Sequence, residues 1–92
     1  RTSYVIIIIA VQKVRIKFLK EGCVVKSLKG HDTGRIYTVI AVIGDSFVLV
    51  ADGKYRKLDN PKQKRIKHLE IVREAALPTS LTDSALRKMC KL

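Results

Sequence analysis

Hydrophobic residues gather in short runs along the chain, and short apolar runs bounded by turn residues are typical of buried β-strands. Apolar residues, many of them β-branched, predominate in 23–27, 35–43 and 47–51, and glycine or aspartate separates these segments. β-branched side chains favour strands over helices. We therefore expect three strands, a glycine-bracketed loop over 28–34, and a turn over 44–46 that returns the third strand antiparallel to the second.

Two further strands are expected after residue 51. Asp52-Gly53 is a strong two-residue hairpin signal, because both central positions of such a turn favour positive φ, and it would lead into a strand over 54–58. Asp59-Asn60-Pro61 would end that strand, and residues 67–72 supply a last one. Five short antiparallel strands in about fifty residues suit a small barrel better than a sandwich.

The end of the chain has a different period. Apolar residues recur there at helical spacing, and either Thr82 or Ser80 supplies a hydroxyl that can cap a helix. The recurring positions are Ala85, Leu86, Met89 and Cys90. The predicted fold is thus mainly β, a barrel over 20–73 followed by a tail over 74–92 with a short C-terminal α-helix.

Residues 1–19 are set apart as an N-terminal extension, and whether they belong to the native chain stays open. The apolar run Tyr4–Val11 is far shorter than the roughly 20 residues that span a bilayer. Basic residues follow it, where a signal peptide carries small ones. Its β-branched content favours a buried strand, and the alternation over 13–18 favours an outer strand with one basic face.

Charge is the unusual property of this chain. Its 92 residues, 47% of them hydrophobic, indicate one globular domain, but 19 Lys and Arg against 8 Asp and Glu give a formal net charge of +11. Such an excess favours a polyanionic partner, nucleic acid first and an anionic membrane surface second. Membrane attachment would need an amphipathic helix, and Tyr4–Val11 lacks helical periodicity. No membrane partner is expected.

The cysteines and histidines indicate neither a disulfide framework nor a metal site. Cys23 and Cys90 are far apart, and the chain has no C-x-x-C, which favours free thiols in the reducing cytoplasm, with Cys23 in the core. Together with His31 and His68 they match no usual zinc spacing, so neither metal nor cofactor is expected.

The chain also lacks a recognisable catalytic arrangement. No nucleophile is paired with either histidine, and there is no P-loop. The aspartates at predicted turns are expected to bond the backbone rather than to catalyse; they are Asp32, Asp45, Asp52 and Asp59. We expect a protein that is not an enzyme.

Residues 24–35, followed by the apolar 39–42, resemble a KOW motif. Its letters here are VVKSLKGHDTGR, and two later segments extend the likeness, ADGKYRKL over 51–58 and PKQKRIKHL over 61–69. The chain from about residue 20 to 92 resembles the small bacterial KOW-domain RNA-binding proteins related to ribosomal protein fourteen-e. This resemblance implies an SH3-like five-stranded barrel whose loops bind RNA, usually ribosomal RNA. Thr33, where a lysine is common, removes one phosphate contact from the pattern.

The glycine loop is the first candidate binding element. Gly30 and Gly34 let the backbone turn tightly and approach a phosphate with exposed N–H groups, while Asp32 would cap the loop's own amides. The alternative is a plain tight turn with solvated charges. The residues assigned to the loop and its flanks are Lys26, Lys29, Gly30, His31, Gly34 and Arg35.

A basic run over 54–67 is the second element. Beyond Pro61 it is expected to cross the surface as a loop, with cations suited to phosphate oxygens. Tyr55 is expected in the core rather than as a platform for bases, and His68 is either a base-stacking residue or an ordinary polar one at a strand end. The assigned cations are Lys54, Arg56, Lys57, Lys62, Lys64, Arg65 and Lys67.

These features predict a monomeric, cytoplasmic RNA-binding protein that docks on ribosomal RNA or a ribosome-assembly intermediate. Most of the few aromatic residues lie in apolar strands, so recognition of RNA shape and backbone is expected rather than a base code. Reversing Lys64 and Arg65 to Glu should weaken RNA binding without unfolding the protein. The alternative is a protein-binding KOW module, which would use an exposed apolar patch and tolerate salt.

Overall fold

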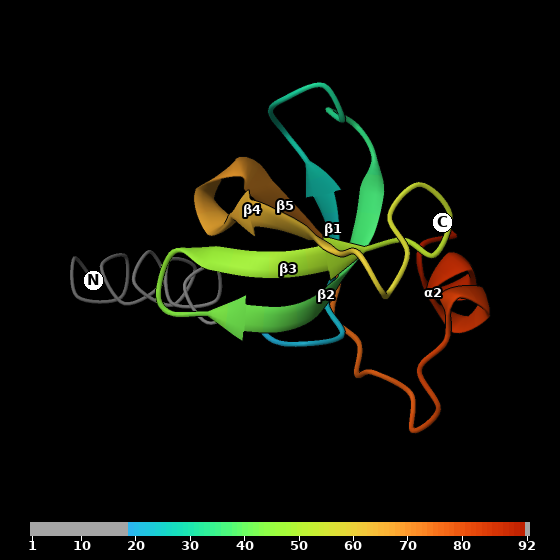
Figure 1. The fold of residues 1–92 in the computed structure, drawn as a ribbon. Coiled ribbons are helices and arrows are strands. Elements are labelled where there is room, and N and C mark those ends of the chain that lie inside the picture. Colours follow the sequence, from blue (N-terminus) through green and yellow to red (C-terminus); the bar gives the residue numbers. More distant parts are fainter. Residues whose placement is uncertain (1–18, 92) are drawn as a thin grey trace, which may run out of the picture.

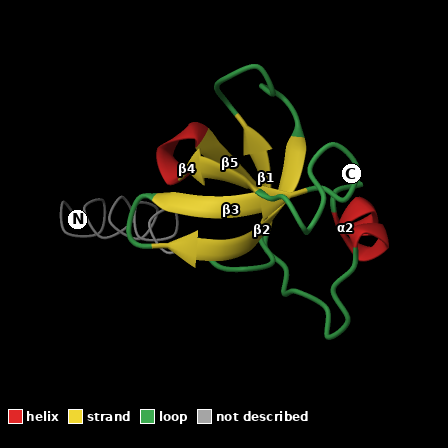
Figure 2. Ribbon diagram, viewed as in Figure 1, coloured by secondary structure: helices red, strands yellow, loops and turns green. Residues whose placement is uncertain are grey.

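The computed structural model describes residues 19–91, which form one five-stranded antiparallel sheet and a short C-terminal helix (Figures 1 and 2). The strands are β1 (Val24–Ser27), β2 (Ile36–Ile43), β3 (Phe47–Ala51), β4 (Lys62–Arg65) and β5 (Leu69–Arg73), with the 3-10 helix η1 (Ile66–His68) and the α-helix α2 (Asp83–Met89). The mainly β fold with a C-terminal helix is confirmed. The strands expected within residues 1–18 lie outside the described residues.

The sheet has the strand order β4-β3-β2-β1-β5 and is not closed within residues 19–91, since β4 and β5 are its edges. These two edge strands are nevertheless joined directly by η1, whose three residues advance only about 6 Å. In a flat sheet, four strand spacings would separate the same edges by about 19 Å. The sheet is therefore strongly curled, and the register shifts in β1 and β2 add to the bend.

The core lies inside the curl. Val48 and Val50 alternate along β3 with more exposed neighbours, and Tyr37 and Val39 face the same interior from β2. The other members of the buried cluster are Leu19, Cys23, Val25, Ile66 and Leu69. The core position expected for Cys23 is confirmed, and both cysteines are free.

The strands expected over 23–27, 35–43 and 47–51 agree with β1, β2 and β3 to within a residue, whereas the fourth strand was placed wrongly. Residues 54–58 are not a strand, because the Asp52 carboxylate accepts hydrogen bonds from the N–H groups of Lys54 (3.0 Å) and Arg56 (2.8 Å). The Asp52 N–H donates to the Arg56 carbonyl at 2.9 Å. The chain thus curls back over 52–56 instead of making a two-residue hairpin.

The segment after Pro61, expected as a surface loop, is the strand β4. It pairs antiparallel with β3, with Arg65 opposite Phe47 and Lys62 opposite Val50. Every residue of β4 is polar, so burial of apolar side chains does not hold this strand in place. It is held by its backbone hydrogen bonds to β3 and by the contacts of Lys62 and Lys64 with Asp32.

Helix α2 packs at the end of the sheet opposite η1 (Figure 2). Of the two expected caps, Thr82 is the one used, since its hydroxyl accepts from the Ala85 N–H at 3.1 Å. Leu86 is fully buried, Thr38 Oγ1 and Cys90 Sγ share a hydrogen bond at 3.3 Å, and Arg73 donates to the Met89 carbonyl. Neither helix in residues 19–91 has the length and apolar character needed to cross a membrane.

Candidate nucleic-acid interface

Asp32 is the hub of a buried polar network rather than a cap for its loop. One carboxylate oxygen accepts from the Ser27 hydroxyl (2.9 Å) and the Lys64 ammonium (3.1 Å). The other accepts from the Tyr37 hydroxyl (2.6 Å) and the Lys62 ammonium (3.0 Å). Asp32 is only 4% exposed. Because its carboxylate accepts from these four side chains and not from the amides of the loop, the amide-capping role expected for it is wrong.

The network sets the charge states of Asp32 and Tyr37. Burial alone would raise the pKa of Asp32, but its four donors hold that pKa well below the usual range. Burial and the hydrogen bond to Asp32 raise the pKa of Tyr37 to about 12. Asp32 is therefore ionised and Tyr37 protonated across the physiological range.

Lys62 and Lys64, both expected to face phosphate, have their ammonium groups in this network. Lys64 is 8% exposed and also donates to the Lys29 carbonyl at 2.9 Å. Replacing Lys64 with Glu would set a second carboxylate against Asp32. The buried position of Lys64 therefore predicts that the double reversal of Lys64 and Arg65 destabilises the fold, contrary to the expectation from the sequence.

The glycine loop has the expected backbone, with φ of 96° at Gly30 and 91° at Gly34. Its amides are less free than expected, since the N–H groups of Thr33, Gly34 and Arg35 all donate to carbonyls within the loop or β1. The loop therefore offers the exposed side chains of Lys29 and His31 rather than a row of free amides.

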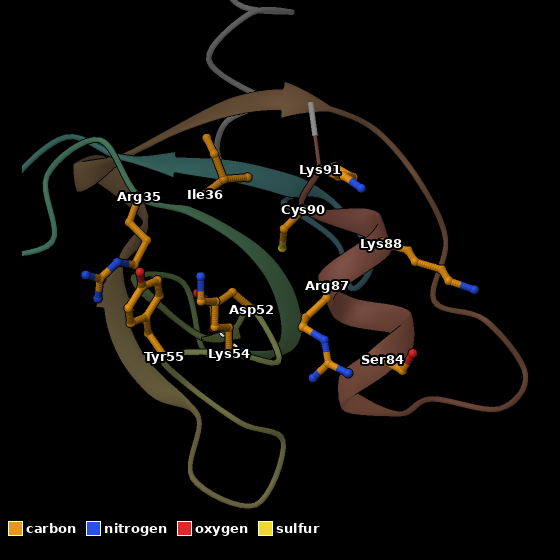
Figure 3. Close-up of a pocket in the computed structure, with 10 residues that line it drawn as sticks. All are labelled: Arg35, Ile36, Asp52, Lys54, Tyr55, Ser84, Arg87, Lys88, Cys90 and Lys91. Carbon is orange, nitrogen blue, oxygen red and sulfur yellow. Dashed lines mark hydrogen bonds between the residues drawn. The ribbon is translucent and has the colours of Figure 1, made fainter.

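A group of cationic side chains lies beside α2. An open pocket of about 570 Å³, here called the α2 pocket, lies between the helix and the β3–β4 loop. Figure 3 shows Arg35 and Tyr55 on one side of it and the helix on the other. Three segments distant in sequence meet there. Its lining is Arg35, Ile36, Asp52, Lys54, Tyr55, Ser84, Arg87, Lys88, Cys90 and Lys91. Five of these side chains are cationic.

Tyr55 stands at the edge of the α2 pocket, and its expected burial in the core is wrong. The residue is 60% exposed, because the curl at 52–56 turns it away from the sheet. The Arg35 guanidinium lies over its ring at 4.0 Å from the centroid, and the Lys54 ammonium lies at 5.1 Å. The ring and the guanidinium together form an exposed flat surface flanked by positive charge.

A contact between the β3–β4 loop and α2, here called the latch, fixes the shape of the pocket. Gly53 has φ of 78°, and a Cβ there would lie 2.1 Å from the Asp83 carbonyl oxygen. Arg87 donates to the Gly53 carbonyl at 2.8 Å, and the Asp83 carboxylate accepts from the Leu58 N–H at 2.8 Å. In Figure 1 the loop accordingly lies beside the helix.

Carboxylates do little to neutralise this surface. Asp52, the one carboxylate lining the α2 pocket, is 6% exposed and already accepts two backbone hydrogen bonds. Asp32 is buried elsewhere, and Asp83 is half-buried in the latch. The only carboxylate among the residues that line the α2 pocket is therefore buried and hydrogen-bonded to the backbone, so it leaves the cations of this pocket largely unneutralised.

A second, smaller pocket lies at the η1 end of the sheet. It measures about 220 Å³ and is lined by Asp45, Ser46, Arg65, Ile66 and Lys67. The Arg65 guanidinium stacks on Phe47 at 5.0 Å from the ring centroid. The exposed Asp45 offsets part of the positive charge, so this pocket suits an anion less well than the α2 pocket.

The remaining candidates are spread over the surface. Lys26 on β1 and Lys57 in the β3–β4 loop are exposed, and Arg56 is half-buried; none of them lines either pocket. Partial burial, followed by nearby charges including Lys29, lowers the pKa of His68. Its imidazole is therefore neutral at pH 7 and adds no cation.

Sequence reasoning missed the three cations at the end of the chain. Arg87, Lys88 and Lys91 line the α2 pocket, and a signal was present, since Arg87 and Lys91 are four residues apart on a predicted helix. What the sequence did not show is the latch, which turns this helix toward Tyr55 and Arg35. Among residues 19–91, no group of three or more His, Cys, Asp or Glu is placed to hold a metal ion.

Comparison with protein-family models and with curated proteins finds no match to this chain.

Proposed function

We propose that this protein binds RNA through the cationic surface at the α2 end of the sheet. The observation that carries the proposal is the α2 pocket, which is lined by five cationic side chains and the exposed Tyr55, and whose one carboxylate is buried. Lys and Arg at such density attract phosphates, and each neutralised phosphate releases counterions. An exposed aromatic ring adds a surface on which a base can stack.

We further propose an SH3-like barrel of the KOW type that docks on ribosomal RNA or an assembly intermediate in the cytoplasm as a monomer. The curled five-stranded sheet, with its edge strands joined by η1, supports the barrel. The two free thiols support the proposed location in the cytoplasm, which is a reducing compartment. The positive φ of Gly30 and Gly34 supports the KOW loop, although its contribution to binding would come from side chains.

A pair of charge reversals tests the RNA surface. Lys88→Glu changes a pocket cation, whereas Lys20→Glu changes an exposed lysine outside both pockets by the same charge. We expect Lys88→Glu to weaken binding of a labelled RNA and to lower the slope of log affinity against log salt by about 1, measured by fluorescence anisotropy. Lys20→Glu should leave the slope unchanged. Equal effects of the two reversals would contradict a defined surface.

The ribosomal partner is tested by co-sedimentation with separated ribosomal subunits at about 0.1 M and about 0.5 M salt, a range over which multi-phosphate binding falls sharply. We expect stoichiometric binding to the large subunit at low salt and its loss at high salt. Absence of binding at both salt concentrations would instead favour the protein-binding alternative.

A further inference from the structure

We propose that the α2 pocket holds one unstacked nucleotide of single-stranded RNA, with its base on the Tyr55–Arg35 surface and its phosphates on the cations of α2. This inference rests on the proposed RNA binding and narrows it, because it names the form of RNA that the pocket selects. It also departs from the expectation that the protein reads only RNA shape and backbone.

The lining combines an aromatic ring with cationic side chains, so it suits a ligand that has both a planar part and an anionic part. A volume of about 570 Å³ lies within the range of pockets that bind small ligands. An inorganic phosphate would contact the cations but not the exposed part of the Tyr55 ring, and an apolar ligand would contact the ring but not the cations. A nucleotide satisfies both, since it joins a planar base to a phosphate.

The pocket separates these two functions in space. Tyr55 and Arg35 form the flat surface on one side, and Arg87 lies across the pocket on the helix, while the side chain of the lining residue Lys88 extends outward from the helix (Figure 3). Bases stack on aromatic rings and on guanidinium planes in proteins that bind single-stranded RNA. The guanidinium of Arg87 donates one hydrogen bond to Gly53 and has further N–H donors that can reach a phosphate.

The latch holds the two sides at a fixed separation before any ligand binds. Gly53 is packed against the Asp83 backbone, and Asp83 is bonded to Leu58, so the loop that carries Tyr55 is anchored to the helix that carries the cations. A site organised in this way loses less conformational entropy when the ligand arrives.

Duplex RNA would not supply the same contact. In an A-form helix the bases are stacked on one another and paired, so their faces cannot reach the Tyr55 ring. Single-stranded loops and ends have bases free to turn outward. The pocket should therefore discriminate between the two forms, while the phosphate contacts shared by both would still give salt-dependent binding.

The test compares three probes: a single-stranded RNA of about ten nucleotides, a duplex of the same length, and inorganic polyphosphate. Tyr55→Leu removes the ring without changing charge, and Tyr55→Phe is the matched control that keeps it. We expect Tyr55→Leu to weaken single-strand binding by about 5- to 100-fold, with duplex and polyphosphate binding nearly unchanged. Tyr55→Phe should bind like the wild type. Because Tyr55 is exposed, neither substitution should change the stability of the fold. Equal midpoints of urea unfolding for the wild type and both variants check this.

Three results would overturn the inference. If Tyr55→Leu binds single strands as well as the wild type while duplex binding persists, the base-stacking site is wrong and RNA binding stands. An equal loss for polyphosphate would show that the ring acts on the cations rather than on a base. If neither RNA binds to the wild type at low salt, the proposed function fails together with the inference.

Discussion

At the scale of single residues, Asp32 is a buried charge that stabilises the fold, whereas most of the charged residues in this protein lie on its surface. It ties the glycine loop to β4 through Lys62 and Lys64, and to β2 through Tyr37. Removing one partner of such a buried pair leaves the other charge desolvated, which is far more costly than losing an exposed ion pair.

We predict that Asp32→Asn lowers the free energy of unfolding by about 3–5 kcal/mol at pH 7, because Lys64 is left buried without a counter-charge. Urea denaturation measures this change. Asp59→Asn is the matched control, since it removes the same charge from an exposed turn, and it should cost less than about 0.5 kcal/mol. Similar costs for the two variants would show that the network contributes little.

The ionised Asp32 carboxylate also determines how the stability of the protein should depend on pH. The pKa of Asp32 is lowered from its ordinary value of 3.8, so the unfolded chain takes up a proton first as the solution is acidified. The stabilisation is therefore complete above that value and is lost as the pH falls below it. Asp32→Asn should lack this part of the acid transition, and a variant as acid-sensitive as the wild type would contradict the assignment.

At the scale of elements, the latch joins α2 to the β3–β4 loop and so creates the α2 pocket. Gly53 is the closest point of approach, with a positive φ and the Asp83 backbone where a Cβ would be. The short helix depends on such contacts because seven residues form no stable helix alone.

We predict that Gly53→Ala is more destabilising than Gly44→Ala. Both glycines have positive φ, which alone costs alanine about 1–2 kcal/mol, but a Cβ at Gly44 would meet nothing within 4 Å. Gly53→Ala should also displace α2 and speed alkylation of Cys90, whose thiol is half-buried against Thr38. Urea unfolding and the alkylation rate measure the two effects. Equal costs and equal rates would contradict the latch.

Element by element, the apolar strands β1, β2 and β3 could be predicted because each is a short run rich in β-branched apolar residues, and glycine and aspartate mark the turns between them. The strand β4 could not, because its inward face is polar: Lys62 and Lys64 alternate correctly, but their partner is the buried Asp32 rather than apolar side chains. The location of Tyr55 was missed for a related reason. The hydrogen bonds of Asp52 turn a segment that looks like a hairpin and a strand into a curl.

At the scale of the whole molecule, the distribution of charge matters more than its sum. The sequence predicts a positive chain, and the fold concentrates accessible cations at the α2 end while burying Asp32 and Asp52. The candidate site was therefore only partly predictable, through Arg35 and Lys54. The helical cations that complete it come from a segment joined to the site by tertiary contacts alone.

The central claim is that this surface binds RNA by neutralising phosphates, and the salt dependence of affinity tests it most directly. With a labelled single-stranded RNA, engagement of all five cations of the α2 pocket predicts a slope of log affinity against log salt near about −3.5. Affinity should fall steeply between about 0.05 and 0.2 M salt. A slope near zero, or no binding at the lowest salt concentration, would contradict the claim.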